Sequence, residues 1–246
     1  MTIVFVHGVP NTAAVWGPLL SVLSDHAVIA LQLPGFGCEA PAGFTGTRYA
    51  YRDWLIEELT AINEPVDLVG HDQGSVISQG VILARPDLIN SWVLGAGVCA
   101  DDFLWHRQAR IWQNTGLGER WRDHFLALDA DTRAGMLVDA GVPAIDATNV
   151  AAGMDRRMLD HILPLYRSES YLEDWAFDEA ATYPPGLVLW GKHDPYQSAE
   201  FGRLAAAASG ARFHELACGH WWQVERPHEV AAELLAHWST TGSAAA

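Results

Sequence analysis

The sequence predicts an α/β fold in which a mainly parallel sheet is covered by helices and interrupted by one inserted helical segment. Short apolar runs alternate along the chain with segments whose apolar residues recur three and four positions apart. Nearly continuous apolar runs are typical of strands that are buried on both faces, as in a parallel sheet. A third observation is that no convincing strand occurs between residues 100 and 185.

Composition and charge narrow the function classes before any motif is considered. The chain has 246 residues, 50% of them hydrophobic, so we expect one domain with a large core. Its net charge of -15 repels nucleic acid and anionic membranes, and no run of Lys or Arg offsets that charge. The three cysteines lack metal-ligand spacing, and we see no signal peptide and no apolar stretch of membrane-spanning length. We therefore expect a cytoplasmic protein with no nucleic-acid partner, no membrane partner and no cofactor.

The individual elements follow from the same periodicities. We expect six strands, at residues 2–6, 27–33, 66–69, 91–94, 187–190 and 212–216. Helices are expected between most of them, and three apolar helix faces are clear: Trp16, Leu19, Leu20 and Leu23; Trp54, Leu55, Leu59 and Ile62; and Val230, Leu234, Leu235 and Trp238.

The segment 100–185 is predicted to be a helical cap inserted after the fourth strand. It is rich in large aromatic residues and its charges fall at helical intervals. Ligands of open α/β sheets bind beyond the carboxyl ends of the strands, so a cap placed there would cover the binding site. The remaining residues, 1–99 and 186–239, would form the core, and the small residues of 240–246 are expected to be a disordered tail.

The segment Gly70-His71-Asp72-Gln73-Gly74 stands between the apolar run 66–69 and an apolar helical pattern. Small residues flank the central position where a strand turns sharply into a helix, because larger side chains would clash there. A carboxylate that attacks saturated carbon forms an ester, which water can hydrolyse. Asp72 is thus the candidate nucleophile, and its ordinary alternative is a helix N-cap.

Two further loops carry candidate catalytic groups behind strand ends. Asp194 follows the run 187–190, and His220 follows the run 212–216. His220 would take a proton from water near the ester, and Asp194 would fix the histidine tautomer and stabilise its charged form. Each residue alone is commonly a loop or turn residue, but the three in this order predict a catalytic triad. Asp101 or Asp102, at the end of the preceding strand, is the rival acid.

The segment His7-Gly8-Val9-Pro10 comes directly after the first strand. A turn at this place would aim backbone N–H groups at the reacting centre, and we expect those of Val9 and Gln73 to form an oxyanion hole. His7 and His71 are expected to pack near the turn without taking part in the chemistry.

At these residues the chain resembles the α/β-hydrolase superfamily along nearly its whole length, and among its branches it is most similar to the epoxide hydrolases. The closing segment Cys218-Gly219-His220-Trp221-Trp222-Gln223 and the cap segment Leu165-Tyr166-Arg167 also resemble that family. The resemblance implies that Asp72 attacks a ring carbon and that Tyr166 protonates the epoxide oxygen. Water activated by His220 with Asp194 would then hydrolyse the ester and release a vicinal diol. The ordinary alternative for Tyr166 is a core aromatic residue of the cap.

The chain departs from the family pattern in three places. The family commonly has a second cap tyrosine near the start of the insertion, yet segment 104–114 contains none, and Tyr171 is the candidate substitute. Gln73 follows the nucleophile where tryptophan is common. The two leading strands of the usual eight are missing, so the run 27–33 would form a sheet edge that needs cover or a partner, such as a second copy in a homodimer.

Dehalogenases share the nucleophilic aspartate, so the second hypothesis is a haloalkane or haloacid dehalogenase with the same triad. Gln73 and Val9 stand where haloalkane dehalogenases place tryptophan and asparagine N–H donors, which disfavours that activity. Trp105, His106 and Trp112 could rebuild a halide site. A third hypothesis is a non-hydrolytic binding protein or a biosynthetic cyclase of the same fold. An esterase is disfavoured, because attack by aspartate on an ester gives an anhydride.

The predicted substrate is small and apolar, aromatic or alicyclic, because the cap is rich in aromatic residues. The residues expected to line its site are Val9, Gln73, Trp105, His106, Trp112, Tyr171 and Trp221. No metal site is predicted, since the histidines of the cap are scattered without metal-ligand spacing.

Overall fold

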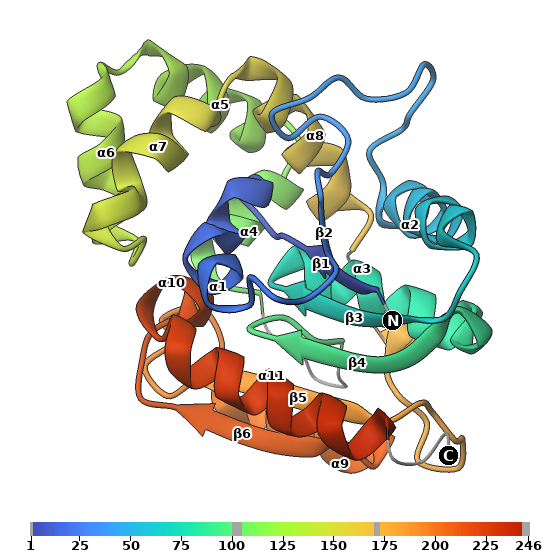
Figure 1. The fold of residues 1–246 in the computed structure, drawn as a ribbon. Coiled ribbons are helices and arrows are strands. Elements are labelled where there is room, and N and C mark those ends of the chain that lie inside the picture. Colours follow the sequence, from blue (N-terminus) through green and yellow to red (C-terminus); the bar gives the residue numbers. More distant parts are fainter. Residues whose placement is uncertain (1, 100–104, 170–172, 243–246) are drawn as a thin grey trace.

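A computed structural model describes residues 2–99, 105–169 and 173–242, and it contains a six-stranded parallel sheet (Figure 1). The strand order is β2-β1-β3-β4-β5-β6, and all neighbouring strands are parallel. The strands are β1 (Ile3–Val6), β2 (Val28–Leu31), β3 (Val66–His71), β4 (Ile89–Gly95), β5 (Gly186–Gly191) and β6 (Arg212–Leu216). All six lie where the sequence predicts strands, which confirms the predicted fold class.

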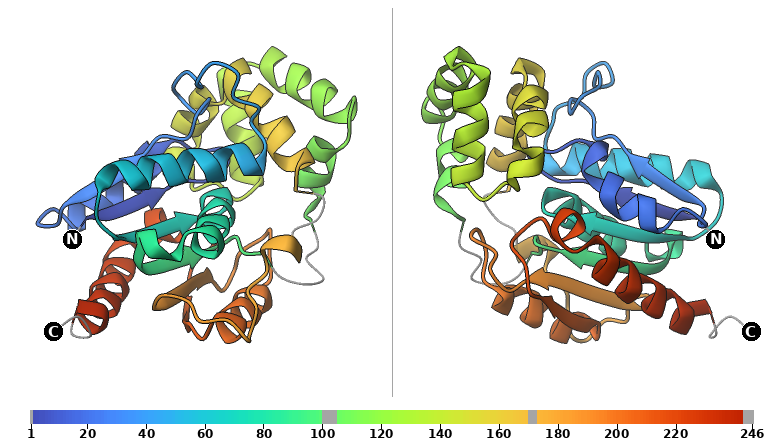
Figure 2. Two further views of the ribbon diagram at one scale, coloured as in Figure 1. Left: turned by 90° about the vertical axis from the view of Figure 1, so that its right-hand side faces the viewer. Right: turned by 60° about the vertical axis from the view of Figure 1, so that its left-hand side comes forward.

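Helices cover both faces of the sheet, as the views of Figure 2 show. Helices α1 (Gly17–Val22) and α11 (Pro227–Gly242) pack against each other, with the 3-10 turn η1 (Ala13–Trp16) and the short helix α10 (Trp222–Glu225) beside them. Helices α2 (Arg48–Ile62), α3 (Gln73–Ala84) and α9 (Ala199–Ser209) cover the other face, and the turn η2 (Pro86–Leu88) leads into β4. The apolar faces predicted for α1, α2 and α11 face the core except at Leu235, which is 40% exposed.

Five helices lie between β4 and β5, beyond the carboxyl ends of the strands (Figures 1 and 2). They are α4 (Arg107–Gln113), α5 (Leu117–Ala127), α6 (Ala130–Asp139), α7 (Ala144–Gly153) and α8 (Arg156–Arg167), followed by the 3-10 turn η3 (Glu173–Trp175). Asp129 and Asp155 begin α6 and α8 by accepting N–H groups of the first turn, as N-cap side chains do. The described part of this segment contains helices and no strand.

The edge strand β2 and the end of helix α11 test two of the sequence predictions. The segment predicted as a sheet edge does lie at one, because β2 pairs with β1 alone in the described part of the chain and Ile29 is 37% exposed. The predicted boundary of a disordered tail at residue 240 is wrong, because α11 continues to Gly242. The Thr240 and Thr241 hydroxyls donate to carbonyl oxygens three residues earlier, and Thr241 is buried. These bonds let small polar residues extend the helix, and the last four residues lie outside the described ranges.

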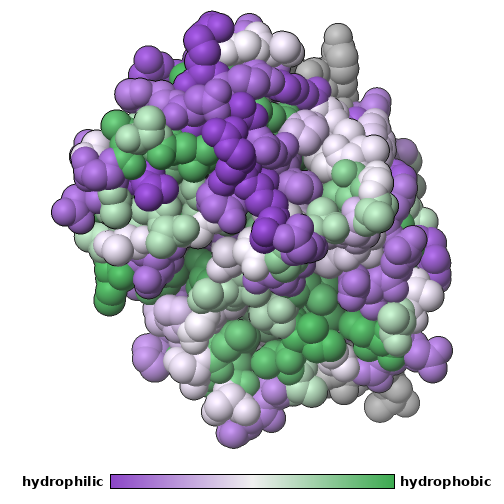
Figure 3. Space-filling model, turned by 90° about the horizontal axis from the view of Figure 1, so that it is seen from above, coloured by the Kyte–Doolittle hydropathy of each residue, from purple (hydrophilic) through white to green (hydrophobic). Residues whose placement is uncertain are grey.

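The outer surface mixes residue types. Seen from above, hydrophobic residues gather in patches among hydrophilic ones (Figure 3). Val138 of α6 and Ile145 of α7 are the exposed large hydrophobic residues of these two helices, at 42% and 87%. Across the described ranges, the helices are all too short or too polar to cross a membrane.

Candidate active site

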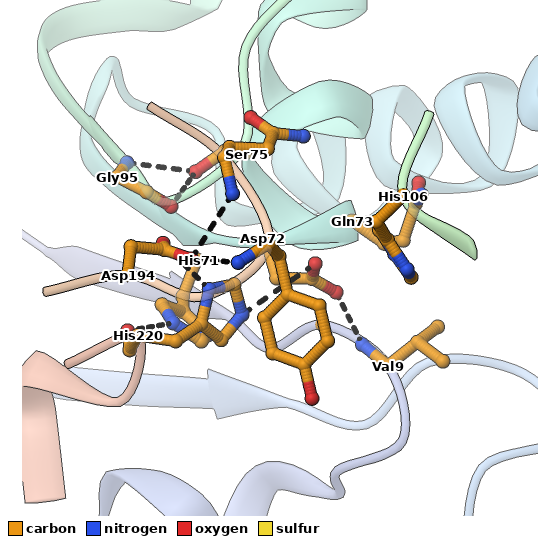
Figure 4. Close-up of polar contacts among 12 residues, drawn as sticks. Val9, His71, Asp72, Gln73, Ser75, Gly95, His106, Asp194 and His220 are labelled. Atoms are coloured by element: carbon orange, nitrogen blue, oxygen red, sulfur yellow. Dashed lines mark hydrogen bonds and ion pairs between the residues drawn. The ribbon is translucent and has the colours of Figure 1, made fainter. Parts of the chain in front are cut away.

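Asp72 occupies a sharp turn between β3 and α3 and has a backbone φ of 53° and ψ of -123°. A positive φ is unfavourable for residues other than glycine, so contacts with the surrounding structure must hold the Asp72 backbone in this conformation. The Asp72 N–H donates to the carbonyl oxygen of Gly95 at 2.9 Å, and the Ser75 hydroxyl bridges both backbone groups of Gly95 (Figure 4). The end of β4 thereby fixes the turn.

Glycines permit the close approach of three segments at this turn. A Cβ atom on Gly74 would lie 2.1 Å from the Val6 carbonyl oxygen, and one on Gly97 would lie 2.3 Å from the Asp72 carbonyl oxygen. A Cβ atom on Gly8 would lie 2.4 Å from Oδ1 of Asp72. These distances explain why small residues flank the turn and why glycine follows His7.

The Asp72 carboxyl group points into the site and is held by backbone N–H groups. Its Oδ1 accepts the Val9 N–H at 2.7 Å (Figure 4). Burial raises the pKa of Asp72, while His220 and the N–H groups of Gln73 and Val9 act in the opposite direction. Val9 and Gln73 thus meet the carboxyl as the sequence predicts. Oδ2 has no hydrogen-bond partner among the described residues and stays available to a ligand.

His220 stands between two carboxyl groups. Its Nδ1 donates to Oδ2 of Asp194 at 2.8 Å, and its Nε2 lies 3.7 Å from Oδ2 of Asp72. The Asp194 Oδ1 accepts the N–H groups of Tyr196 and Gln197, which orients that carboxylate. Burial alone would lower the pKa of His220, but the Asp194 and Asp72 carboxylates together raise it. The structure thus brings Asp72, Asp194 and His220 together, with Nε2 of His220 facing the Asp72 carboxyl group.

The two other histidines near the turn are structural, as expected. His71 Nε2 donates to the His220 carbonyl oxygen at 2.9 Å, and its ring packs against Trp16 and Trp222. His7 Nδ1 donates to the Gly8 carbonyl oxygen, and Nε2 accepts the Leu33 N–H at 3.1 Å. Burial lowers the pKa of both rings, that of His7 to about 4.

A cavity of about 130 Å³ lies between these loops and the inserted helices. Asp72 and His220 form its polar end, and its remaining wall is largely apolar and aromatic, with Trp112, Trp121, Phe125 and Trp221 among the lining residues. Trp221 also contacts the His220 ring edge-on at 4.7 Å between centroids. No Lys or Arg side chain lines the described wall of this cavity.

Tyr166, from α8, lines the cavity together with Asp72 and His220. Its ring packs against Trp105 and Trp112, with centroids 5.4 Å and 4.9 Å apart. Burial, and then the nearby Asp72 and Glu169 carboxyl groups, raise the pKa of Tyr166 well above its usual range. The hydroxyl therefore keeps its proton at neutral pH and can donate a hydrogen bond.

His106 lines the same cavity, and its position fixes its tautomer. Nδ1 accepts the Ala109 N–H at 3.3 Å, as the N-cap of α4. Burial lowers the pKa of His106 to about 4, so the ring is neutral at pH 7. A neutral imidazole that accepts at Nδ1 carries its proton at Nε2. His106 is thus an uncharged N–H donor in the cavity that Tyr166 also lines, and the sequence does not reveal this tautomer.

Two residues of the site were missed by the sequence analysis. Tyr196 lines the cavity, contacts the His220 ring at 4.9 Å, and donates its hydroxyl to the Ala140 carbonyl oxygen at 2.5 Å. Glu169 is completely buried, and its carboxyl accepts the side-chain N–H of Gln73 at 3.0 Å. Their positions, two residues after Asp194 and three after Tyr166, are the signals that could have found them.

Some predicted residues cannot be placed. Tyr171 and the rival acids Asp101 and Asp102 lie outside the described residues. Within the described ranges, no three His, Cys, Asp or Glu side chains converge in a group that could hold a metal ion.

A model of the alpha/beta hydrolase family matches residues 3–233. An (E)-2-((N-methylformamido)methylene)succinate hydrolase of Acinetobacter baylyi is 28% identical over 205 residues, which are 80% of this chain and 74% of that protein.

Solved structures with the same fold include three kinds of hydrolase. An esterase of Thermogutta terrifontis has a TM-score of 0.78 at 18% identity, over 98% of this chain and 90% of that one. A variant of a proposed epoxide hydrolase of Pseudomonas aeruginosa has a TM-score of 0.78 at 20% identity, over 99% and 90%. The haloalkane dehalogenase DbeA of Bradyrhizobium elkani has a TM-score of 0.77 at 18% identity, over 99% and 91%.

Proposed function

Because the chain belongs to the alpha/beta hydrolase family, we propose that it is a hydrolase that opens epoxides to vicinal diols through an ester on Asp72. One observation carries the proposal. A carboxylate nucleophile, a histidine base and an uncharged tyrosine hydroxyl line one small apolar cavity. A strained epoxide ring needs these three groups: a nucleophile for carbon, an acid for oxygen, and a base for the ester.

In the first step, Oδ2 of Asp72 attacks a ring carbon and the carbon–oxygen bond of the ring breaks. Oδ2 suits this role because the Val9 N–H engages Oδ1 instead. The ring oxygen takes the proton of Tyr166, while the Nε2–H of His106 supplies a second hydrogen bond. His106 would thus do the work of the second cap tyrosine that is absent from segment 104–114. The product of this step is a hydroxyalkyl ester of Asp72.

In the second step, water loses a proton to Nε2 of His220 and attacks the carbonyl carbon of the ester. Asp194 orients the ring through its 2.8 Å hydrogen bond and stabilises the imidazolium that forms. The oxygen that was Oδ1 becomes an oxyanion and stays bound by the N–H groups of Val9 and Gln73. Collapse of this intermediate releases the diol, whose oxygen takes the proton from His220. Hydrolysis leaves Asp72 as a carboxylic acid, and its proton passes through solvent to the deprotonated Tyr166 oxygen, so the sum is epoxide plus water.

The character of the donors favours an epoxide over a halide. An oxygen that leaves carbon becomes strongly basic and needs a proton, whereas a halide ion needs only N–H donors. Tyr166 provides a transferable hydroxyl proton beside Asp72, and its raised pKa keeps that proton in place until the oxygen demands it. The N–H of His106 would also suit a halide, so a dehalogenase is the second candidate.

The cavity wall restricts the substrate. Asp72 and His220 line the cavity together with a few uncharged polar side chains, and most of the other lining residues are apolar or aromatic. The substrate named for the Acinetobacter baylyi relative is a succinate, which carries two carboxylates. Among the described residues, no Lys or Arg lines the cavity to pair with them. We therefore propose a small, uncharged, apolar epoxide with an aromatic or alicyclic body.

The experiment is to trap the ester. In a His220→Gln variant the first step remains and the second loses its base, so the adduct should accumulate. Incubation with a panel of aryl and alicyclic epoxides and of haloalkanes, followed by intact and peptide mass measurement, identifies it. His193→Gln, a neighbouring exposed histidine, is the matched control and should turn substrate over without trapping it.

The mass gain decides between the candidates. A gain equal to the whole epoxide, on a peptide that contains Asp72, is the expected result. A gain equal to an alkyl group without its halogen would assign the chain to the dehalogenases. If no compound gives an adduct and the parent protein turns none over, the triad serves a non-hydrolytic role, as in a binding protein or a cyclase.

A further inference from the structure

Glu169 is a buried acid that the steps above do not use. It lies directly beyond α8, and its side chain is completely buried. Oε2 accepts the Gln73 side-chain N–H at 3.0 Å, whereas Oε1 has no hydrogen-bond partner among the described residues. Within the same ranges no cation forms a salt bridge with it. A buried carboxylate with one amide donor is strongly unfavourable, so this carboxyl requires another explanation.

Gln73 also has a buried side-chain oxygen without a hydrogen-bond partner among the described residues. Its side chain is buried, and this oxygen is Oε1. Two unpartnered acceptor oxygens therefore sit on two side chains that one N–H···O bond already joins. A proton on Oε1 of Glu169 turns this oxygen into a donor. A carboxylic acid and a primary amide can then pair through two hydrogen bonds, and a single proton satisfies both side chains.

The charges around Glu169 act on that proton from several elements. Burial raises the pKa of Glu169 well above its usual range, and Asp72 acts in the same direction. The Gln73 amide and the Arg48 guanidinium of α2 oppose them. Tyr166 of α8 faces the same acid, because Glu169 in turn raises the pKa of the Tyr166 hydroxyl. An ionised Glu169 would thus place a second negative charge beside Asp72.

We propose that Glu169 is a positioning residue which, as an uncharged acid, pairs with Gln73 and holds the residue whose backbone N–H faces the nucleophile. The proposal rests on the proposed function, since it gives Glu169 a part in the reaction at Asp72. Its chemical content is specific: Glu169 keeps its proton at neutral pH, and an amide in its place preserves the pairing. Ionisation of Glu169 at high pH should slow attack by Asp72 and weaken proton donation by Tyr166.

Infrared spectroscopy tests the protonation state on the whole protein. The parent should show the carbonyl stretch of a protonated carboxylic acid at neutral pH, and Glu169→Gln should lack it. Gln73→Leu should shift the band to higher frequency, because the acid loses its amide partner. Glu58→Gln, an exposed glutamate of α2, is the matched control and should leave the band unchanged. Absence of the band from the parent would overturn the proposal.

Kinetics on an epoxide then test the role. Glu169→Gln should keep kcat within about 3-fold and lose the alkaline fall in kcat that we expect of the parent. Glu169→Ala should lower kcat by about 10- to 100-fold with little change in KM, because Gln73 loses its anchor. If the alanine variant does not fold, Glu169→Met, which keeps the volume and removes both oxygens, replaces it. Equal losses in the glutamine and alanine variants would show that a charged carboxylate is needed, and would overturn the proposal.

The two proposals fail in different ways. If no epoxide reacts, in parent or trapping variant, the proposed function fails while the infrared bands still report whether Glu169 and Gln73 form an acid–amide pair. If the ester forms on Asp72 but the acid band is missing, the reaction stands and the role of Glu169 falls.

Discussion

The carboxyl edge of the sheet and the inserted helices line the same cavity, but different interactions hold their side chains in place. Asp72, Asp194 and His220 are held by backbone hydrogen bonds and by glycines that bring three segments together. Tyr166 and His106 are held mainly by ring packing and by one N-cap hydrogen bond. Backbone-held groups keep their positions when a neighbouring side chain changes, whereas groups held by packing move with their neighbours. In the proposed reaction, the sheet edge would therefore supply the nucleophile and the base at fixed positions, and the inserted helices would supply the acid and the apolar wall that selects the substrate.

The strongest test of this contrast is Asp72→Asn. The amide cannot act as the nucleophile, so kcat should fall by about 10⁴-fold or more for every substrate. The thermal midpoint should not fall, because burial raises the pKa of Asp72 and ionisation of this carboxyl therefore costs folding free energy. Steady-state kinetics and thermal unfolding measure both.

Asp67→Asn is the matched control on the same strand. Its buried carboxyl accepts hydrogen bonds from Ser91 and Asn90 at the far end of β3. This variant should lose stability and keep its kcat. Similar kinetic losses in both variants would mean that Asp72 supports the fold and is not the nucleophile.

Tyr166→Phe should have the next largest effect, about 10²- to 10³-fold in kcat, the usual range for loss of a general acid. Some activity should remain because His106 still donates its N–H to the ring oxygen. Tyr51→Phe is the control, since that buried hydroxyl donates to the Pro34 carbonyl oxygen away from the cavity. It should cost about 1 kcal/mol of unfolding free energy and leave kcat unchanged. An unaltered kcat in Tyr166→Phe would make the residue a packing aromatic only.

The smallest expected effect is a change in the pH dependence of stability, and it comes from His7 at the edge of the sheet. Burial lowers its pKa to about 4, against an ordinary value of 6.5 in the unfolded chain. Between these values the unfolded state binds more protons, so the folded state loses stability as the pH falls below 6.5. From pH 7 to pH 5 this histidine alone should remove about 2 kcal/mol of unfolding free energy.

His7→Gln should lessen that pH dependence by the same amount when denaturant unfolding is measured at both pH values. His106→Gln should lessen the pH dependence by a similar amount, because burial also lowers the pKa of His106 to about 4, but unlike His7→Gln it should also slow turnover. An unchanged slope in His7→Gln would show that the ring titrates normally in the folded protein.

The sequence predicts the sheet edge better than it predicts the helices. The positions of the strands, the turn at Asp72 and the loops of Asp194 and His220 follow from apolar runs and glycine spacing, because those patterns carry backbone constraints. The Val9 N–H contact also follows, since the turn after the first strand has few ways to approach Asp72.

The contents of the cavity were only partly predictable. Aromatic residues of the insertion pack against one another and also line the cavity, and periodicity does not distinguish the two fates. The tautomer of His106 depends on an N-cap bond, the Glu169 carboxyl on a partner 96 positions away, and the Tyr196 hydroxyl on the carbonyl of Ala140. Such contacts arise only when separate segments meet.

The glycines around Asp72 have a consequence for how the nucleophile can change during evolution. Gly74 and Gly97 set the close approach of the backbone, and their nearest neighbours are backbone atoms of Val6, His7 and Asp72, not the Asp72 carboxyl group. The backbone turn and the nucleophilic side chain are therefore separable. A single substitution at position 72 can change the nucleophile while the turn, the N–H donors and the histidine keep their positions. A lineage built on this turn can change its chemistry without having to invent a fold.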